Sequence, residues 1–459
     1  MATGRTLMTS ATDLSGVITG DWCVGCGACT AVDGSIALEL DQRSGAYRPS
    51  HAGGPSAAAV CPAVAVDIDA IGRRLFPDTR HTAHGAIERV WLAQSTDYEE
   101  NLQASSGGVI KPVLKHALST GLVDSVIALG EESALDYRHH LVTDEAGIDS
   151  LPGSIYHVVE HSSLYDHLRG SVGKVAIVGI PCQLEGLHLF LESPQGRPFV
   201  ERVKLTVGLF CGWQYTMHAM SALGTYLRFD PAAIEKVAYR GGGPVGKLRI
   251  SLSDGSERTL NRRVAYSAQV AFDRSFNLPR CHVCVNHSNM LADIAVGDAW
   301  LPESAFSRTG VSLVIARTST AAGLLEELAG TEQIRLSETT DDVIERSQGR
   351  PVAYGDSAYS LLDHLADQGV PHPEINGPNR GAGAAVSPEV VAKAWLQVEK
   401  KRALQRAGRY RWLWLRKATV ELPALLRRLM RSRLIRRYLS ALTARGTGDS
   451  EQAGIDGFV

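Results

Sequence analysis

Four cysteines near the N-terminus constrain the fold of this chain more than any other feature of its sequence. Three follow a C-x2-C-x2-C spacing and the fourth precedes a proline: Cys23, Cys26, Cys29 and Cys61. Thiolates at this spacing let one tight loop surround a cubane, because each sulfur can bind a different iron. Gly25 and Gly27 permit the positive φ angles that such a loop requires.

This set predicts the ligands of one 4Fe–4S cluster, with a short hairpin over 36–40 and 46–49 between the triplet and Cys61. The alternative is a zinc site. Zinc sites usually have paired C-x2-C hooks rather than a triplet and a Cys-Pro pair.

A second group of four cysteines is spread along the chain: Cys182, Cys211, Cys281 and Cys284. Cys182 follows the predicted strand Val175–Ile180, and Cys211 follows the predicted strand Val203–Phe210. Because ligands bind at the carboxyl ends of strands in an open α/β sheet, these two should face one crevice, where the C-x2-C pair can complete a tetrad. The alternatives are separate roles: Cys182 as a reactive thiol near a helix N-terminus, Cys211 as a core residue, and the pair as a redox-active or zinc-bound hook.

A predicted βαβ unit carries serine and glycine at the start of its helix. The strand Ile87–Gln94 leads to a short loop, a helix over 109–119 and a further strand over 123–129. The loop contains Ser105, Ser106, Gly107 and Gly108. Backbone N–H groups at a helix start, with a serine hydroxyl, suit a phosphate or pyrophosphate. Serine is also the ordinary N-cap residue, so the same pattern has a purely structural explanation.

Two later segments carry further polar candidates. Tyr239, Arg240 and Gly241 open a glycine-rich loop before the strand Lys247–Leu252, which a hairpin turn at 254–255 follows. A predicted strand over 291–300 contains Asp293, Gly297 and Asp298. The two carboxylates could bind ribose or flavin-ring atoms, or could cap the following turn. A nicotinamide-binding Rossmann domain is not expected, because no G-x-G-x-x-G follows a strand.

Composition places the chain among soluble globular proteins. Its 459 residues predict two to four domains, and 44% hydrophobic with 21% charged residues exclude a disordered chain, a collagen or a disulfide-stapled mini-protein. The first fourteen residues lack a signal-peptide pattern, and no apolar run reaches eighteen residues. We therefore expect a cytoplasmic protein, in which eight cysteines serve as ligands or catalytic thiols rather than in disulfides. A net charge of -2 argues against nucleic-acid binding.

The C-terminal part is basic. Between Lys400 and Arg445 stand 15 Lys and Arg against one acid, Glu421. After a Gly/Pro-rich linker over 377–385, we expect a helix over 388–406 that ends near Gly408. Residues 409–445 combine Trp, Leu and Arg, which suits peripheral contact with an anionic membrane at its inner face. A helical arm packed on the body or on a partner subunit is the alternative, and RNA binding is less favoured.

Taken in order, these motifs resemble the coenzyme F420 hydrogenase/dehydrogenase beta-subunit family, which includes 7-hydroxymethyl chlorophyll a reductase-like proteins. The resemblance runs from about residue 21 to residue 317. It rests on the first cysteine triplet together with the following segments: Ser105–Gly108, Pro181–Gln183, Phe210–Cys211, Tyr239–Gly241, the Cys281/Cys284 pair, Ala292–Ile294 and Gly297–Asp298.

The resemblance implies an α/β fold with an N-terminal ferredoxin-like 4Fe–4S module, a mixed or parallel flavin- and cluster-binding core, and a helical C-terminal tail. The expected segments are 1–85 for the ferredoxin-like domain, 86–170 for the flavin-phosphate domain, 171–345 for the domain with the second cluster, 346–385 for a linker and 386–459 for the basic tail. It also implies two 4Fe–4S clusters and FAD. The second cluster would be bound by Cys182, Cys211, Cys281 and Cys284, and Ser106–Gly108 would contact flavin phosphates.

Flavin and clusters together indicate a converter between two-electron and one-electron transfer. The expected function is an oxidoreductase that passes electrons between ferredoxin or another redox protein and an organic substrate such as coenzyme F420. The sequence identifies no catalytic residue. The alternatives are a non-catalytic electron-transfer subunit of a larger complex and a zinc-stabilised interaction protein.

Overall fold

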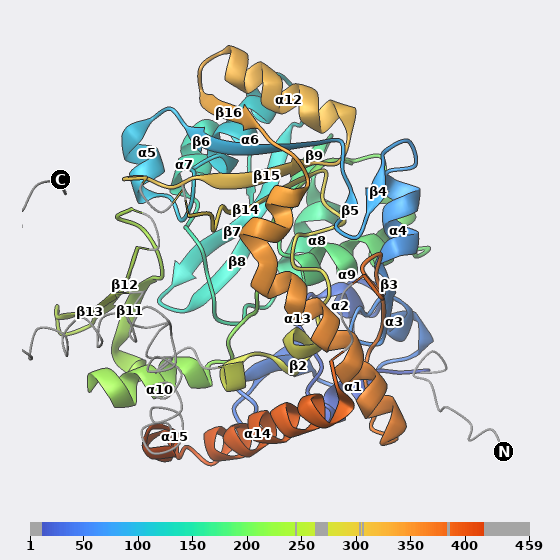
Figure 1. Cartoon of the computed structure of the whole chain (residues 1–459), viewed down its shortest axis with the longest axis vertical. Helices are drawn as coiled ribbons and strands as arrows, with labels where there is room; N and C mark the ends of the chain where they lie inside the picture. Colours follow the sequence, from blue (N-terminus) through green and yellow to red (C-terminus); the bar gives the residue numbers. More distant parts are fainter. Residues whose placement is uncertain are drawn as a thin grey trace, which may run out of the picture.

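A computed structural model describes residues 12–243, 246–261, 274–302, 304, 307–382 and 386–416. Figure 1 shows a large sheet covered by helices, a smaller N-terminal module beside it, and two long C-terminal helices, α13 and α14, that run along the module. No helix in these ranges is long and apolar enough to cross a bilayer.

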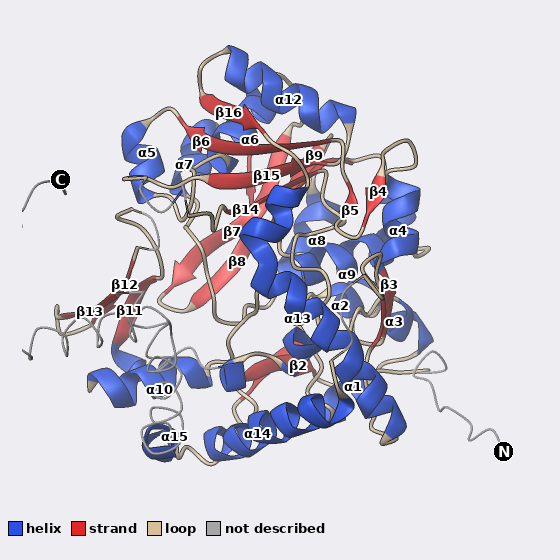
Figure 2. Cartoon of the chain, viewed as in Figure 1, coloured by secondary structure: helices blue, strands red, loops and turns tan. Residues whose placement is uncertain are grey.

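The largest sheet in the described part of the chain has eight strands, in the order β16-β6-β15-β14-β10-β9-β7-β8. Their bounds are β6 Arg89–Ser95, β7 Ser125–Ser133, β8 Asp136–Val142, β9 Val175–Gly179, β10 Val203–Leu209, β14 Ile294–Asp298, β15 Ser312–Ala316 and β16 Ile334–Glu338. Strands β7, β9, β10 and β14 are mutually parallel, whereas β8, β15 and β16 run antiparallel to their neighbours. The expected mixed α/β architecture is therefore confirmed (Figure 2).

Helices cover both faces of this sheet, because alternate residues of each strand point to opposite sides. Val126 and Ala128 join one core with α6 and α12, while Ile127 joins another with α8 and α9. The helices that follow the sheet strands are α5 Tyr98–Gln103, α6 Ile110–Ser119, α7 Glu145–Ser150, α8 Ser162–Gly170, α9 Pro181–Glu192 and α12 Ser319–Gly330.

The expected βαβ unit forms, but its two strands are not neighbours. β6 and β7 run in the same direction, yet β15, β14, β10 and β9 lie between them. Strands from the expected segments 86–170 and 171–345 thus share one sheet and one core.

The N-terminal module consists of short elements: α1 Ser15–Thr19, α2 Ala28–Val32, β1 Leu38–Asp41, β2 Ala46–Pro49, α3 Pro55–Ala59, β3 Ala65–Asp67 and α4 Ile68–Leu75. The predicted hairpin is confirmed, since β1 and β2 pair antiparallel from Leu38 opposite Pro49. The hairpin of β4 His81–Thr82 and β5 Gly85–Ala86 leads into the large sheet.

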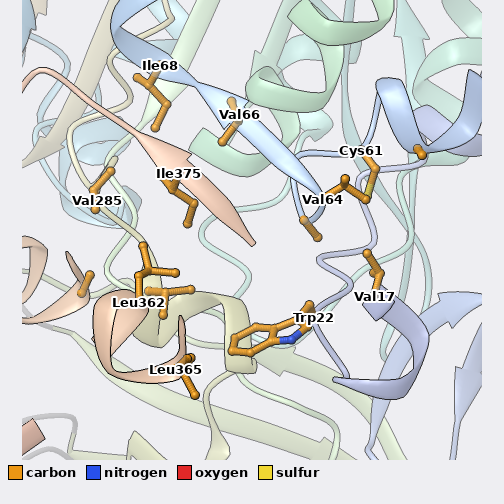
Figure 3. Close-up of a cluster of buried hydrophobic side chains, with 14 of the residues drawn as sticks. Val17, Trp22, Cys61, Val64, Val66, Ile68, Val285, Leu362, Leu365 and Ile375 are labelled. Atoms are coloured by element: carbon orange, nitrogen blue, oxygen red, sulfur yellow. The ribbon is translucent and has the colours of Figure 1, made fainter. Parts of the chain in front are cut away.

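Residues 346–385, which we expected to be a linker, contain structure that completes this module. Helix α13 spans Asp342–Asp367, and β17 Glu374–Asn376 pairs with β3 in parallel. Figure 3 shows Leu362, Leu365 and Ile375 packed with Val66 and Trp22 of the module. Sequence analysis missed α13 because its apolar residues could be recognised as a buried face only once the N-terminal module was known to pack on them.

A three-stranded sheet stands apart from the large one (Figure 1). It contains β11 Ile234–Ala238, β12 Lys247–Leu252 and β13 Glu257–Asn261, and it packs with α10 His218–Leu227. The predicted strand 247–252 and its hairpin are confirmed. Short 3-10 segments connect these elements: η2 Arg197–Phe199, η3 Pro231–Ala233, η4 Arg274–Phe276 and η5 Pro279–Val283.

The predicted C-terminal helix is confirmed as α14 Pro388–Arg406, and α15 spans Tyr410–Arg416. Arg406 and Arg402 of α14 form ion pairs with Asp21 at 2.8 and 3.4 Å. The Tyr410 hydroxyl of α15 lies 2.8 Å from the His218 ring. This part of the basic segment therefore packs on the body. Residues 417–459 lie outside the described ranges, and membrane contact through 409–445 stays a prediction.

Candidate functional site

The first cysteine set surrounds the start of α2. Cys23 and Cys26 lie in the loop before this helix, Cys29 lies within it, and Cys61 follows α3. Burial, together with the charge of Cys61, raises the pKa of the Cys23 thiol to about 12. Burial, and then the charge of Cys61, likewise raise the pKa of Cys26 and of Cys29. The four thiols are thus near neighbours in a buried environment.

Two glycines let this loop lie against the segment 159–162. Gly25 and Gly27 have φ angles of 69° and 78°, in the left-handed region that favours glycine. A Cβ on Gly25 would lie 2.8 Å from the Val159 carbonyl oxygen, and one on Gly27 would lie 2.6 Å from the Ser162 nitrogen. Both positions need glycine for backbone conformation and for space.

The second cysteine set gathers at the carboxyl edge of the large sheet. Cys182 is the second residue of α9, the helix after β9, and Cys211 follows β10, as the sequence predicted. The C-x2-C pair lies on η5 and just after it. Burial raises the pKa of the Cys182 thiol, and the charges of Cys211, Cys281 and Cys284 raise it further.

Each set therefore contains thiols that raise one another's pKa. Within the described ranges, no group of three or more His, Cys, Asp or Glu side chains is close enough to hold a single metal ion. A 4Fe–4S cluster does not need its ligands to meet at one point. Each of its four irons binds a separate thiolate, so the four sulfurs lie farther apart than around a single ion. Coordination by either set stays a prediction.

Helix α9 connects the two sets. Cys182 stands in its first turn, and Gly186 stands one turn later, where an added Cβ would lie 2.9 Å from the Cys26 sulfur. A helix rises 1.5 Å per residue, so these positions are about 6 Å apart along the axis. The two groups of thiols therefore lie on either side of one helical turn.

A second connection runs through Gln183 and His161. The Gln183 amide, next to Cys182, donates to the His161 ring at 3.1 Å, and the His161 backbone N–H donates to the Gly25 carbonyl at 3.0 Å. Burial lowers the pKa of His161 to about 3, which keeps the ring neutral. The start of α9 is thereby held against the first cysteine loop.

One buried hydroxyl tests whether the first set fits a cluster. Among the residues that the structure describes, the Tyr165 hydroxyl has no hydrogen-bond partner, although the side chain is buried. A Cβ on Gly186 would lie 3.4 Å from this hydroxyl and 2.9 Å from the Cys26 sulfur. Buried polar groups nearly always have partners, so an unpaired donor close to thiols of the first set fits a group that carries acceptor sulfurs.

Three of the flavin candidates, Ser105, Arg240 and Asp298, meet at the same sheet edge as Cys182 and Cys211. Arg240 donates to both carboxylate oxygens of Asp298, at 2.9 and 3.0 Å, and to the Ser105 carbonyl. It also donates to the Tyr156 hydroxyl at 3.3 Å and lies over the half-exposed Trp300 ring. Arg240 thus joins the serine–glycine loop to the end of β14.

Ser106 and Gly107 are engaged with β15 rather than free. The Ser106 hydroxyl donates to the Val311 carbonyl at 3.0 Å, and the Gly107 N–H donates to the Ser312 hydroxyl at 2.9 Å. A Cβ on Gly107 would lie 2.7 Å from the Ser312 nitrogen. Helix α6 begins at Ile110, and its N-cap, Val109, provides no side-chain cap. The glycine at 107 is therefore required for packing, whatever else it contacts.

The remaining candidates divide into two places. Gly297 lies at the end of β14, where a Cβ would strike the Phe210 ring beside Cys211, and Gly241 adopts a φ of 108°. Asp293 lies at the opposite end of β14 from Asp298 and accepts hydrogen bonds from Thr206 at 2.7 and 2.8 Å. The structure therefore does not bring Asp293 together with the other candidates.

Tyr239 is buried, and its hydroxyl lies 2.6 Å from the His157 ring. Tyr239 packs in the core of the three-stranded sheet. Although it precedes Arg240 in sequence, it is not one of the polar groups that Arg240 contacts.

The chain was also compared with known proteins. Models of the family "Coenzyme F420 hydrogenase/dehydrogenase, beta subunit" match residues 90–166 with the N-terminal model and 172–342 with the C-terminal model, which together cover more than half of the chain. The chain belongs to this family. Membership supports a redox role for the chain.

Two relatives illustrate the range of the family. Coenzyme F420 hydrogenase subunit beta of Methanosarcina barkeri is 26% identical over 241 residues, which cover 51% of this chain and 79% of that protein. Coenzyme F420-dependent sulfite reductase of Methanocaldococcus jannaschii is 24% identical over 388 residues, which cover 77% and 56%. A chain of the F420-reducing NiFe hydrogenase complex from Methanosarcina barkeri superposes with a TM-score of 0.49 at 20% identity, over 62% of this chain and 94% of that one.

Sequence reasoning missed an aromatic contact that lies beside both cysteine sets. Trp395 of α14 stacks on Trp22, next to Cys23, with ring centroids 6.3 Å apart. The same Trp395 ring meets the edge of His282, which lies between Cys281 and Cys284, at 5.5 Å. The only signal was a tryptophan in the predicted C-terminal helix, and no sequence pattern linked it to the cysteines.

Proposed function

We propose that this chain is an iron–sulfur flavoprotein oxidoreductase with two 4Fe–4S clusters and FAD. It would transfer electrons between a ferredoxin-type redox partner and an organic two-electron substrate, with coenzyme F420 as the leading candidate. When bound, the clusters would supply one-electron transfer and the flavin would exchange one- and two-electron chemistry.

The observation that carries this proposal is the placement of two four-thiol sets on either side of one turn of α9. The first set would bind one cluster and the second set the other. Cys182 lies one helical turn from Gly186, which contacts Cys26. This short separation suits electron transfer between the two proposed clusters. Buried walls of aliphatic residues around both sets would exclude water and oxygen.

The flavin part of the proposal rests on the second set and its surroundings. Cys211 lies next to Phe210, which packs on Gly297, and Asp298 pairs with Arg240 beside Ser105. A flavin held by Arg240 and Trp300 at this edge would lie next to the second cluster. Arg240 would offer positive charge to phosphate or to a reduced flavin ring, and the Trp300 indole would offer a stacking surface.

The second candidate function is a non-catalytic electron-transfer subunit of a larger redox complex. Several relatives are named as subunits of F420 hydrogenase or dehydrogenase, which favours an assembly. In that case the chain would bind both clusters and a redox partner without converting a substrate itself.

The experiment is anaerobic purification of the full chain, followed by iron, zinc and flavin analysis. Wild-type protein should contain about eight irons and one released FAD per chain. Cys61→Ala and Cys281→Ala should each lose about half of the iron, because each removes a ligand of one cluster only. Full iron without flavin would favour the electron-transfer subunit, and zinc in place of iron would contradict both functions.

A further inference from the structure

A buried arginine lies between the two cysteine sets. Arg280 directly precedes Cys281, and its side chain is almost fully buried. Its Nε lies 3.5 Å from the carbonyl oxygen of Pro62, the residue after Cys61. The side chain of Arg280 therefore contacts the backbone next to the first cysteine set, although Arg280 itself is the sequence neighbour of Cys281 in the second set.

The counter-charge of Arg280 comes from the helix that connects the two sets. Glu185 of α9 is completely buried, and its carboxylate accepts from Arg280 at 3.2 Å. The other carboxylate oxygen accepts from the Asn286 amide at 3.0 Å, and the Asn286 carbonyl accepts from the Met290 N–H at 2.6 Å. These bonds fix the ion pair in one geometry.

The charge of Arg280 reaches thiols of both sets. The guanidinium contacts the backbone next to Cys61, in the first set, and belongs to the residue that directly precedes Cys281, in the second. Glu185, of opposite charge, lies three residues after Cys182 on α9, about one turn along the helix.

Stability does not explain this arrangement well. Replacing a buried ion pair by apolar groups of similar volume is often neutral or stabilising, because both charges lose their hydration. The neighbouring cores of both sets are aliphatic and could accommodate such groups.

We propose that the Arg280–Glu185 ion pair is a shared electrostatic element that sets the reduction potentials of both clusters. The inference rests on the proposed function, because it requires a cluster in each cysteine set. A fixed positive charge stabilises the reduced form, which is more negative, and a fixed negative charge opposes it. Arg280 and Glu185 are positioning residues in this account, since neither binds iron.

The test is a redox titration of the full chain, purified anaerobically and followed by the EPR signals of both clusters. Arg280→Gln should shift both midpoint potentials to more negative values. Glu185→Gln should shift both to more positive values, because the arginine charge is then unopposed. Each shift should amount to about tenfold in the reduction equilibrium, which is about 59 mV for one electron.

Two further variants separate charge from packing. Arg280→Lys keeps the charge and should leave both potentials closer to wild type than Arg280→Gln does. The double variant Arg280→Gln/Glu185→Gln removes both charges and should lie between the two single variants. Arg74→Gln is the matched control, because Arg74 pairs with Glu192 at the exposed end of the same helix, and it should change neither potential.

The outcomes are distinguishable. Shifts of equal sign in the two single variants, a shift of one cluster only, or no shift at all would overturn the shared role. Loss of iron from every variant at these two positions would also overturn it and would show that the pair maintains the fold. A wild-type chain without two cluster signals would instead contradict the proposed function.

Discussion

Gly186 lies directly against Cys26: a Cβ on this glycine would stand 2.9 Å from the cysteine sulfur, closer than real contacts allow. The glycine is in the middle of α9, where its flexibility would otherwise be a disadvantage. Its presence there keeps the helix that carries Cys182 in its first turn in contact with the first cysteine loop.

Gly186→Ala should therefore displace Cys26 and lower the iron content by about half, through loss of the first cluster. Crowding of a packed interior should also destabilise the chain by about 1–3 kcal/mol. The control is Gly323→Ala in α12, where an added Cβ meets nothing within 4 Å. That change should raise the free energy of unfolding by up to about 1 kcal/mol. Iron analysis and denaturant unfolding measure both effects, and a fully loaded, stable Gly186→Ala protein would contradict the contact.

Tyr165→Phe should make the potential of the first cluster more negative while the iron content stays unchanged. The buried hydroxyl lies near Cys26 without a partner in the described part of the chain, so we expect it to donate to a cluster sulfur. Loss of that bond should cost the reduced cluster about 1 kcal/mol. The second cluster of the same molecule is the internal control. A redox titration in which both potentials match wild type would exclude this hydrogen bond.

Arg240→Gln should lower the FAD content strongly while both clusters remain. Arg240 is buried and joins Asp298 to Ser105, so its loss opens the predicted flavin edge and leaves a carboxylate unpaired. Breaking such a pair costs about 3–5 kcal/mol in the general case, so stability must be measured alongside the flavin. Arg89→Gln removes an exposed ion pair with Glu338 and should change neither quantity noticeably. Retention of full flavin by a folded Arg240→Gln protein would place the flavin elsewhere.

Gly107 is a poor position for the same test. Its missing side chain makes room for the backbone of β15, so a larger residue there would disturb the sheet before it could obstruct a phosphate.

His157 predicts a pH dependence of stability. Burial lowers the pKa of its ring to about 4, and the ring lies between the Tyr239 hydroxyl and the Leu135 carbonyl. The unfolded chain, with a pKa near 6.5, binds more protons below that pH, so stability is complete above about 6.5 and falls as the pH decreases toward 4.

The loss should approach about 1.4 kcal/mol per pH unit for this histidine. His157→Gln should reduce the slope of unfolding free energy against pH between 6.5 and 4.5, as measured by urea unfolding. An unchanged slope would mean that His157 is not neutral and buried in the folded protein.

Much of the fold could be predicted from sequence because the signals were local. The strand at 175–179 is a continuous apolar run, the strand at 203–209 is rich in Val and Leu, and α14 begins at a proline and ends shortly before a glycine. Cys182 and Cys211 were placed at one sheet edge correctly because both follow parallel strands.

The rest depended on contacts between distant segments. Nothing local predicts that β15 inserts antiparallel between β14 and β6, which brings Ser312 to Ser106 and Gly107. The Arg280–Glu185 pair joins residues 95 positions apart, and charged residues are normally expected at the surface. Asp293 was grouped with Asp298 by sequence, although five residues of extended strand place them at opposite ends of β14.

The most direct test of the central claim is EPR spin quantification of the anaerobically purified full chain after complete reduction. Two clusters on either side of one turn of α9 should give about two spins per chain, with signals broadened or split by their mutual interaction. Cys61→Ala should give about one spin with a simple, uncoupled signal. A wild-type chain with one spin or none, or with two spins that do not interact, would contradict the account.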